Sequence, residues 1–207
     1  DRTVAICIRP ETLVEPETAL LFLRRELMHI ADMLDPAFGY VPSLPPHPAG
    51  PAHDRLLLDR YRVLWNCTVD GRLAKQGTLG DQGRRQRLSE FAGAFPCPEN
   101  MTMECFGRVF DAARPEHARL VALAKDPEVA FGLAARAREQ AHRCALCSFP
   151  TTVLEPRPED LPEEAIHAIR DDFPAWESAN GLCPQCADLY RSRSMSLAAA
   201  ALLPGIR

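Results

Sequence analysis

The sequence predicts an α+β fold that is mostly helical, with a helical N-terminal domain carrying a short strand element and a small C-terminal module. Three observations indicate this: long segments with apolar residues at helical spacing, few runs of β-type residues, and two cysteine pairs in the last third of the chain. With 207 residues, 46% of them hydrophobic, a substantial core is possible. We expect a domain over residues 1–140, a module over 141–194 and a short apolar tail over 195–207.

The charge balance excludes a globally basic surface. The formal net charge is −4 and the isoelectric point is about 5.9, so no overall field attracts nucleic acid. No apolar run reaches the roughly 18–20 residues that a membrane-spanning helix needs. We therefore expect no membrane span. Whether a further segment precedes Asp1 stays open.

The first half of the chain predicts one strand and two helices. Thr3–Ile8 is a β-type run that ends before Pro10. A helix is expected from Glu17 to about Leu34, because its apolar residues recur at helical spacing, and Asp35-Pro36 ends it. A proline-rich loop follows, and then a helix over about Asp54–Asn66 that ends before a turn at Asp70-Gly71.

Further helices are expected in the second half. They cover approximately Arg84–Phe95, Met101–Ala113, Pro115–Ala124 and Pro127–His142. In the C-terminal module, a strand is expected over Phe149–Leu154, a helix is expected to begin at Pro162, and another continues from Ala187.

Two CxxC pairs, Cys144–Cys147 and Cys183–Cys186, carry the most specific chemical signal. Each pair directs two sulfurs at one point, and two pairs together complete a tetrahedral all-sulfur shell, which suits Zn²⁺. Such a closed shell is typical of a structural site. An iron–sulfur cluster is the alternative, because four thiolates also suit iron. Metal-binding thiolates indicate a reducing compartment, most simply the cytoplasm.

The order of elements around these pairs adds a resemblance. A cysteine knuckle, a strand, an inserted helix and a second knuckle that opens a helix resemble a treble-clef or zinc-ribbon module over about 50 residues. The resemblance implies a structural zinc site and does not name a function.

The first long helix contains a second possible site. Glu26, His29 and Asp32 are spaced three residues apart, so they lie near one stripe of the helix. The segment resembles the HExxH helix of zincin-type metallopeptidases, which implies a general base at Glu26 and a zinc ligand at His29. Arg25 stands where the first ligand histidine belongs, and a guanidinium does not bind a metal. Asp32 or Asp70 is the candidate replacement ligand, so His29 and Asp32 form a possible second metal site.

The same helix also has a purely structural interpretation. Glu26, His29 and Asp32 would then lie on the solvated side of an amphipathic helix, with Arg25 paired to Asp32 or another carboxylate. An intermediate interpretation is a zincin-like fold that has lost its metal, so that the N-terminal domain is a degenerate metallopeptidase-like domain without catalytic chemistry.

A local basic stretch offers a third interpretation. It consists of Arg72, Lys75, Arg84, Arg85 and Arg87. Cations near a zinc module are typical of nucleic-acid contacts, because neutralising phosphates drives affinity, but a solvated helix face explains them as well.

Taken together, the residues favour a zinc-binding protein with a non-catalytic role in binding or assembly and with a protein partner. The alternatives are a metal-dependent hydrolase centred on Glu26 and His29, and a nucleic-acid-binding regulator that uses the basic stretch.

Overall fold

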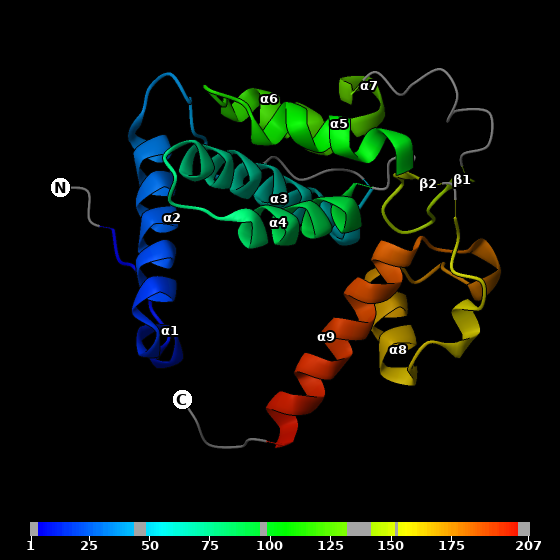
Figure 1. The fold of residues 1–207 in the computed structure, drawn as a ribbon. Coiled ribbons are helices and arrows are strands. Elements are labelled where there is room, and N and C mark those ends of the chain that lie inside the picture. Colours follow the sequence, from blue (N-terminus) through cyan, green and yellow to red (C-terminus); the bar gives the residue numbers. More distant parts are fainter. Residues whose placement is uncertain (1–3, 44–48, 96–98, 132–141, 152, 203–207) are drawn as a thin grey trace. The chain divides into compact units, whose positions relative to one another are not determined.

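The computed structural model describes residues 4–43, 49–95, 99–131, 142–151 and 153–202 (Figure 1). Most of these residues are helical, and the described part contains one two-stranded antiparallel sheet, so the predicted mostly helical α+β class is confirmed. The chain divides into two compact units. Unit 1 comprises Asp1–Ser43 and Arg60–Phe131, and unit 2 comprises Leu44–Asp59 and Gly132–Arg207.

Unit 1 consists of helices. They are α1 (Pro10–Val14), α2 (Pro16–Leu34), the larger part of α3 (Pro51–Lys75), α4 (Asp81–Ala94), α5 (Glu99–Phe110), α6 (His117–Lys125) and α7 (Pro127–Phe131). The helix predicted over Pro127–His142 is present as α7, and residues 132–141 lie outside the described part. Proline at the first position starts α2, and the backbone amide of Asp35 closes its last turn by donating to the carbonyls of Ala31 and Asp32.

The strand predicted over Thr3–Ile8 is wrong for the residues that can be checked. Residues 4–9 are irregular, and the one sheet in the described part pairs two other segments. A β-type run forms a strand only where a neighbouring strand accepts its hydrogen bonds, and the surrounding unit supplies helices instead.

Helix α3 is the central element of unit 1, and it is longer than predicted. Asp70-Gly71 does not form a turn but lies inside the helix, in a stretch that is almost wholly buried from Leu64 to Leu73. Gly71 permits a close helix crossing, since a Cβ at this position would lie 1.6 Å from the carbonyl oxygen of Phe110 in α5. The glycine is therefore required by packing and does not break the helix.

Aromatic side chains fill the core around this crossing. Phe91 stacks on Phe95 at 4.9 Å and meets Phe106 edge-on at 5.7 Å between ring centroids, and Phe106 lies 4.9 Å from Phe110. All four rings are at most 1% exposed. Such ring pairs stabilise a core beyond the area that they bury, by about 0.5–1.5 kcal/mol each.

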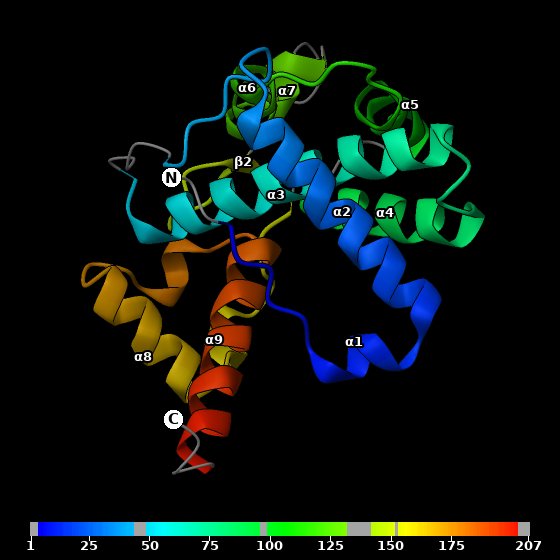
Figure 2. The ribbon, with the colours of Figure 1, turned by 90° about the vertical axis from the view of Figure 1, so that its left-hand side faces the viewer.

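Helix α2 has the reverse of the expected orientation. Asp32, expected on the solvated side, is 5% exposed, whereas Leu20, Leu27 and Leu34 are 48%, 57% and 57% exposed. These three leucines recur every seven residues and so share one face of the helix, which we call the leucine stripe. Figure 2 shows α2 crossing α3 and α4. Its polar side chains contact α3, as described below, and its leucine stripe faces away from the core.

Unit 2 combines the start of α3 with the C-terminal segments. Its other elements are β1 (His142–Arg143), β2 (Pro150–Thr151), the short 3₁₀ helices η1 (Pro158–Asp160) and η2 (Ser178–Asn180), α8 (Glu163–Asp172) and α9 (Pro184–Leu202). Helices α8 and α9 lie side by side in both ribbon views (Figures 1 and 2). The tail expected from residue 195 begins as the last turns of α9, and residues 203–207 lie outside the described part.

Within the described residues, every helix is too short or too polar to cross a lipid bilayer.

Replacing Gly71 with alanine tests the helix crossing. We expect Gly71→Ala to destabilise the protein by roughly 2 kcal/mol or more, because the new methyl group overlaps a backbone atom that cannot rotate away. The matched control is Gly93→Ala in α4, where a Cβ meets nothing within 4 Å. This control is expected to be neutral or to stabilise by up to about 1 kcal/mol, because alanine favours helix. Urea unfolding measures both, and equal stabilities would contradict the crossing.

Candidate metal centre

The four cysteines of the two CxxC pairs form one buried cluster. Cys144, Cys147, Cys183 and Cys186 are each at most 4% exposed, and their sulfur atoms all lie within 4.8 Å of one another. Two of the separations are 3.7 Å, from Cys144 to Cys186, and 3.8 Å, from Cys147 to Cys183. A regular tetrahedron of sulfurs about 2.3 Å from a central ion has edges of about 3.8 Å. The cluster therefore has the size and donor set to hold a metal ion.

The first pair lies in the turn between the two strands. β1 and β2 pair antiparallel, with His142 opposite Thr151 and Arg143 opposite Pro150. The backbone closes the turn through Cys144, whose amide donates to Phe149 and whose carbonyl accepts from Ser148. Ser148 has a positive φ of 59°, which turns the chain back into β2. This short hairpin fixes the direction in which both sulfurs point.

The second pair lies at the start of α9. Cys183 directly precedes the first helical residue, Pro184, and Cys186 follows one turn into the helix. Partial positive charge at a helix N-terminus stabilises thiolates. Two backbone amides also donate to sulfur: that of Cys183 to the Sγ of Cys144 at 3.2 Å, and that of Cys186 to the Sγ of Cys183 at 3.4 Å. Both features favour the ionised form that a metal binds.

The sulfurs differ in their readiness to ionise. Hydrogen bonds from Cys147 and then from the other two cysteines lower the pKa of Cys144 below its usual value. Hydrogen bonding to Cys144 and then to the other two raises the pKa of Cys186. The thiolates that form first are thus stabilised by hydrogen bonds from the thiols that are still protonated. The remaining thiols lose their protons less readily, because each new thiolate is repelled by those already present. A divalent cation removes this repulsion, so its binding releases the remaining protons.

A histidine far away in the sequence supports the first pair. His53, in the first turn of α3, donates from Nδ1 to the backbone carbonyl of Cys147 at 2.8 Å, and its ring stacks on Phe149 at 4.4 Å. His53 is 6% exposed. This contact has no signal in the amino-acid pattern, because a single histidine 94 residues from its partner has no recognisable spacing. Hydrogen bonds of this kind fix the backbone that presents the ligands.

Asp172 joins three helices of unit 2. Its carboxylate accepts from Tyr190 at 2.7 Å, Arg193 at 2.9 Å and Arg55 at 3.2 Å. Burial alone would raise the pKa of Asp172. The hydrogen bond from Tyr190 and the charges of the two guanidinium groups have a larger, opposite effect, so the pKa lies below its usual value. The end of α8 is thereby linked to α9, which carries the second cysteine pair, and to α3, which carries His53.

The segment of α2 that contains Arg25, Glu26 and His29 has a different set of contacts. Arg25 donates to both oxygens of Asp70, at 2.7 and 2.9 Å, and Arg87 donates to the same carboxylate at 2.8 Å. The Asp70 side chain is 1% exposed. Arg25, which stands where the HExxH motif has its first histidine, is thus one of two arginines that bind a buried carboxylate. Removing one partner of such a buried pair typically destabilises a protein by about 3–5 kcal/mol.

The two residues of the possible second metal site also have protein partners. Asp32 accepts from Arg72 at 2.6 and 2.7 Å and from the Trp65 indole at 2.7 Å. His29 Nε2 bonds to the Asn66 side chain at 2.9 Å, and its Nδ1 is buried without a partner. Burial lowers the pKa of His29, although the hydrogen bond with Asn66 and the charges of Glu26 and Asp32 act to raise it. Within the described residues, the four cysteines are the only group of three or more ligand side chains that lie together.

The basic stretch contributes largely to the fold. Arg72 and Arg87 bind the buried carboxylates described above, and Lys75 donates to the Asp111 carbonyl at 2.7 Å. Arg84 lies over the Phe110 ring at 4.9 Å. Arg84 and Arg85 are exposed. The cations thus follow one stretch of sequence without forming one continuous charged face.

Comparison with known proteins finds no matching family model, no matching curated protein and no matching solved structure. The zincin-like resemblance of α2 and the treble-clef-like resemblance of the cysteine module therefore stay predictions.

A variant of His53 tests the support of the metal centre. We expect His53→Phe to lose metal to a competing chelator about 10–100 times more readily, because the Cys147 carbonyl loses its donor while the stack on Phe149 is retained. His167→Phe is the matched control, since His167 is 68% exposed on α8. Chelator titration followed by absorbance measures both, and equal metal retention would contradict the role of His53.

Proposed function

We propose that this protein is a non-catalytic zinc-binding protein in which a four-cysteine site holds unit 2 in its fold, and that its role is binding or assembly. The observation that carries the proposal is the buried cluster of four cysteine sulfurs that lie within 4.8 Å of one another. Binding energy at such a site is folding energy, because the unfolded chain does not bring the four thiols together.

The sulfur separations support a single ion at the centre. Separations of 3.7 and 3.8 Å match the edge expected around one zinc ion, and the two pairs approach from a hairpin and from a helix start. In an iron–sulfur cluster each cysteine binds a separate iron or shares one with a second cysteine, which spreads the four sulfurs around several metal atoms. The limit of 4.8 Å between all four sulfurs favours the single ion.

The composition of the site supports a structural role over a catalytic one. A catalytic zinc has three protein ligands and an open position for water or substrate, whereas four cysteines fill all four positions. The hairpin followed by a helix that carries the second pair supports a treble-clef-like assignment for the module. Reduced thiolate ligands fit a reducing compartment, so we place the protein in the cytoplasm.

The reversed orientation of α2 supports a role in binding. Leucines at seven-residue spacing are normally covered, and here Leu20, Leu27 and Leu34 are about half exposed while the polar face is turned inward. Leu23 and Ile30, half-buried between them, complete a heptad seam. A seam of this shape fits an amphipathic helix of a protein partner, and the N-terminal domain then acts as a degenerate zincin-like binding domain.

One observation favours a second candidate, a metal-dependent hydrolase at α2. The Nδ1 atom of His29 is buried without a partner, and Glu26 is close enough for its charge to raise the pKa of His29. Against this candidate, both oxygens of Asp32 and of Asp70 are bound by arginines. A hydrolase would need one of these carboxylates to change partners in order to bind a second metal.

Elemental analysis combined with zinc-edge X-ray absorption tests the proposal. We expect one zinc per chain, no visible colour, and four sulfur neighbours at about 2.3 Å. Cys186→Ser should lower the zinc content, whereas Cys7→Ser, at an exposed cysteine, should not. Two metals per chain, with nitrogen or oxygen neighbours lost in Glu26→Gln or His29→Gln, would favour the hydrolase. Iron with a brown colour would contradict zinc.

A further inference from the structure

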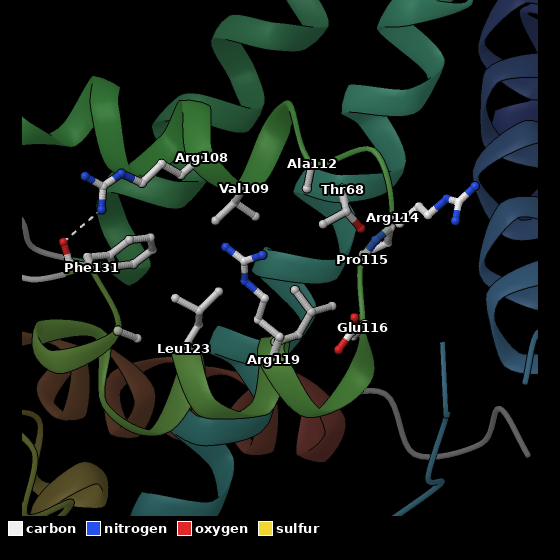
Figure 3. Close-up of a pocket in the computed structure, with 12 residues that line it drawn as sticks. Thr68, Arg108, Val109, Ala112, Arg114, Pro115, Glu116, Arg119, Leu123 and Phe131 are labelled. Atoms are coloured by element: carbon white, nitrogen blue, oxygen red, sulfur yellow. Dashed lines mark hydrogen bonds between the residues drawn. The ribbon is translucent and has the colours of Figure 1, made fainter. Parts of the chain in front are cut away.

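A small cavity within unit 1 is separate from the metal centre. It has a volume of about 80 Å³ and lies between the end of α5, the start of α6 and α7 (Figure 3). One side is apolar and is formed by Val109, Leu120, Leu123 and Phe131. Leu120, Leu123, Val109 and Phe131 are 3–7% exposed, so these walls belong to the packed core. The cavity therefore has a firm hydrocarbon surface on one side.

Arginines provide the polar part of the cavity. Arg108, Arg114 and Arg119 all line it, together with a single carboxylate, Glu116. In Figure 3 the Arg119 guanidinium points into the space between Val109 and Leu123, whereas Arg114 points away from it. The described residues provide no hydrogen bond or ion pair to Arg119. Arg119 is an exposed residue, so its guanidinium stays in contact with water while it points over the apolar wall.

Arg108 is held in place beside it. One of its terminal nitrogens donates to the Phe131 carbonyl at 3.0 Å, and another binds the exposed carboxylate of Glu104 on the preceding turn. These contacts hold the Arg108 side chain at the edge of the cavity, and in Figure 3 its guanidinium points toward the Phe131 carbonyl and away from Arg119. The recess thus has one guanidinium at its edge that is bound to protein groups, and one exposed guanidinium, that of Arg119, that points toward its apolar wall.

We propose that this cavity binds a small monocarboxylate with a short hydrocarbon body. Guanidinium groups bind carboxylates through paired hydrogen bonds, and no residue in the described part of the chain occupies the donors of Arg119. The apolar wall fits a chain of two or three carbons. An apolar cavity of about 150 Å³ can bind benzene, and a volume of about 80 Å³ favours smaller groups. Inorganic phosphate has no hydrocarbon part to bury against the apolar wall, so the wall favours a carboxylate with a hydrocarbon body.

The proposal is tested by titrating the full-length, metal-loaded protein with butyrate and recording the amide chemical shifts by NMR. We expect saturable shifts for residues of α5, α6 and α7 at millimolar or lower concentration. Butyramide, which has the same shape without the charge, should bind at least 10-fold more weakly. Inorganic phosphate should also bind more weakly than butyrate.

Two variants and one control complete the test. Arg119→Gln should weaken butyrate binding at least 10-fold, and Ala112→Leu should weaken it by filling the cavity without changing charge. Arg85→Gln is the matched control, because Arg85 is an exposed arginine on α4 outside the cavity lining. Each variant is first checked for a wild-type melting temperature, and if Arg119→Gln does not fold, Ala112→Leu decides.

Three results would overturn the proposal: no saturable shifts at tens of millimolar butyrate, equal binding of butyramide, or an equal loss of binding in Arg85→Gln. Phosphate binding more tightly than butyrate would also overturn it, since the apolar wall would then have no role. None of these results depends on the zinc site, so the outcome is independent of the proposed function.

Discussion

Four sulfur atoms held within 4.8 Å of one another, away from water, impose the main physical constraint on unit 2. Uncharged thiols gain little from such close packing, and thiolates repel one another, so the arrangement is favourable when a cation lies between them. The two segments that supply the sulfurs are a two-residue-strand hairpin and a helix start, and neither is stable alone. The hydrogen bond from His53 and the three contacts of Asp172 then place the surrounding helices about this centre.

Unit 1 depends on a different balance, in which buried charges take part in the helix packing. Asp70 lies between Arg25 and Arg87, and Asp32 lies between Arg72 and Trp65. These pairs turn the polar face of α2 toward α3, and the leucine stripe consequently faces outward. The buried ion pairs of α2 and its exposed leucines thus have one structural cause. The polar residues of α2 fix its orientation through ion pairs, and its apolar residues remain on the surface.

The parts of the structure that the sequence predicted are those set by local spacing. The CxxC pairs predicted the cysteine cluster, because three-residue spacing directs two sulfurs to one point. Pro16 and Asp35 marked the ends of α2 correctly. Where distant contacts decide, prediction failed. Asp70-Gly71 has the local pattern of a turn, but burial of α3 and the approach of Phe110 keep it helical. Neither the contact of His53 with Cys147 nor the inward orientation of Asp32 has any local signal.

Hydrogen exchange on the full-length protein, with and without its metal, tests the central claim most directly. Amides of β1, β2, α8 and the first turns of α9 should lose protection when a strong chelator removes the metal, because the sulfur cluster no longer holds these segments. Amides of α4 and α5, packed around the phenylalanine core of unit 1, should keep theirs. Retained protection throughout unit 2 after complete metal removal would contradict the account, since the fold would then not depend on the metal.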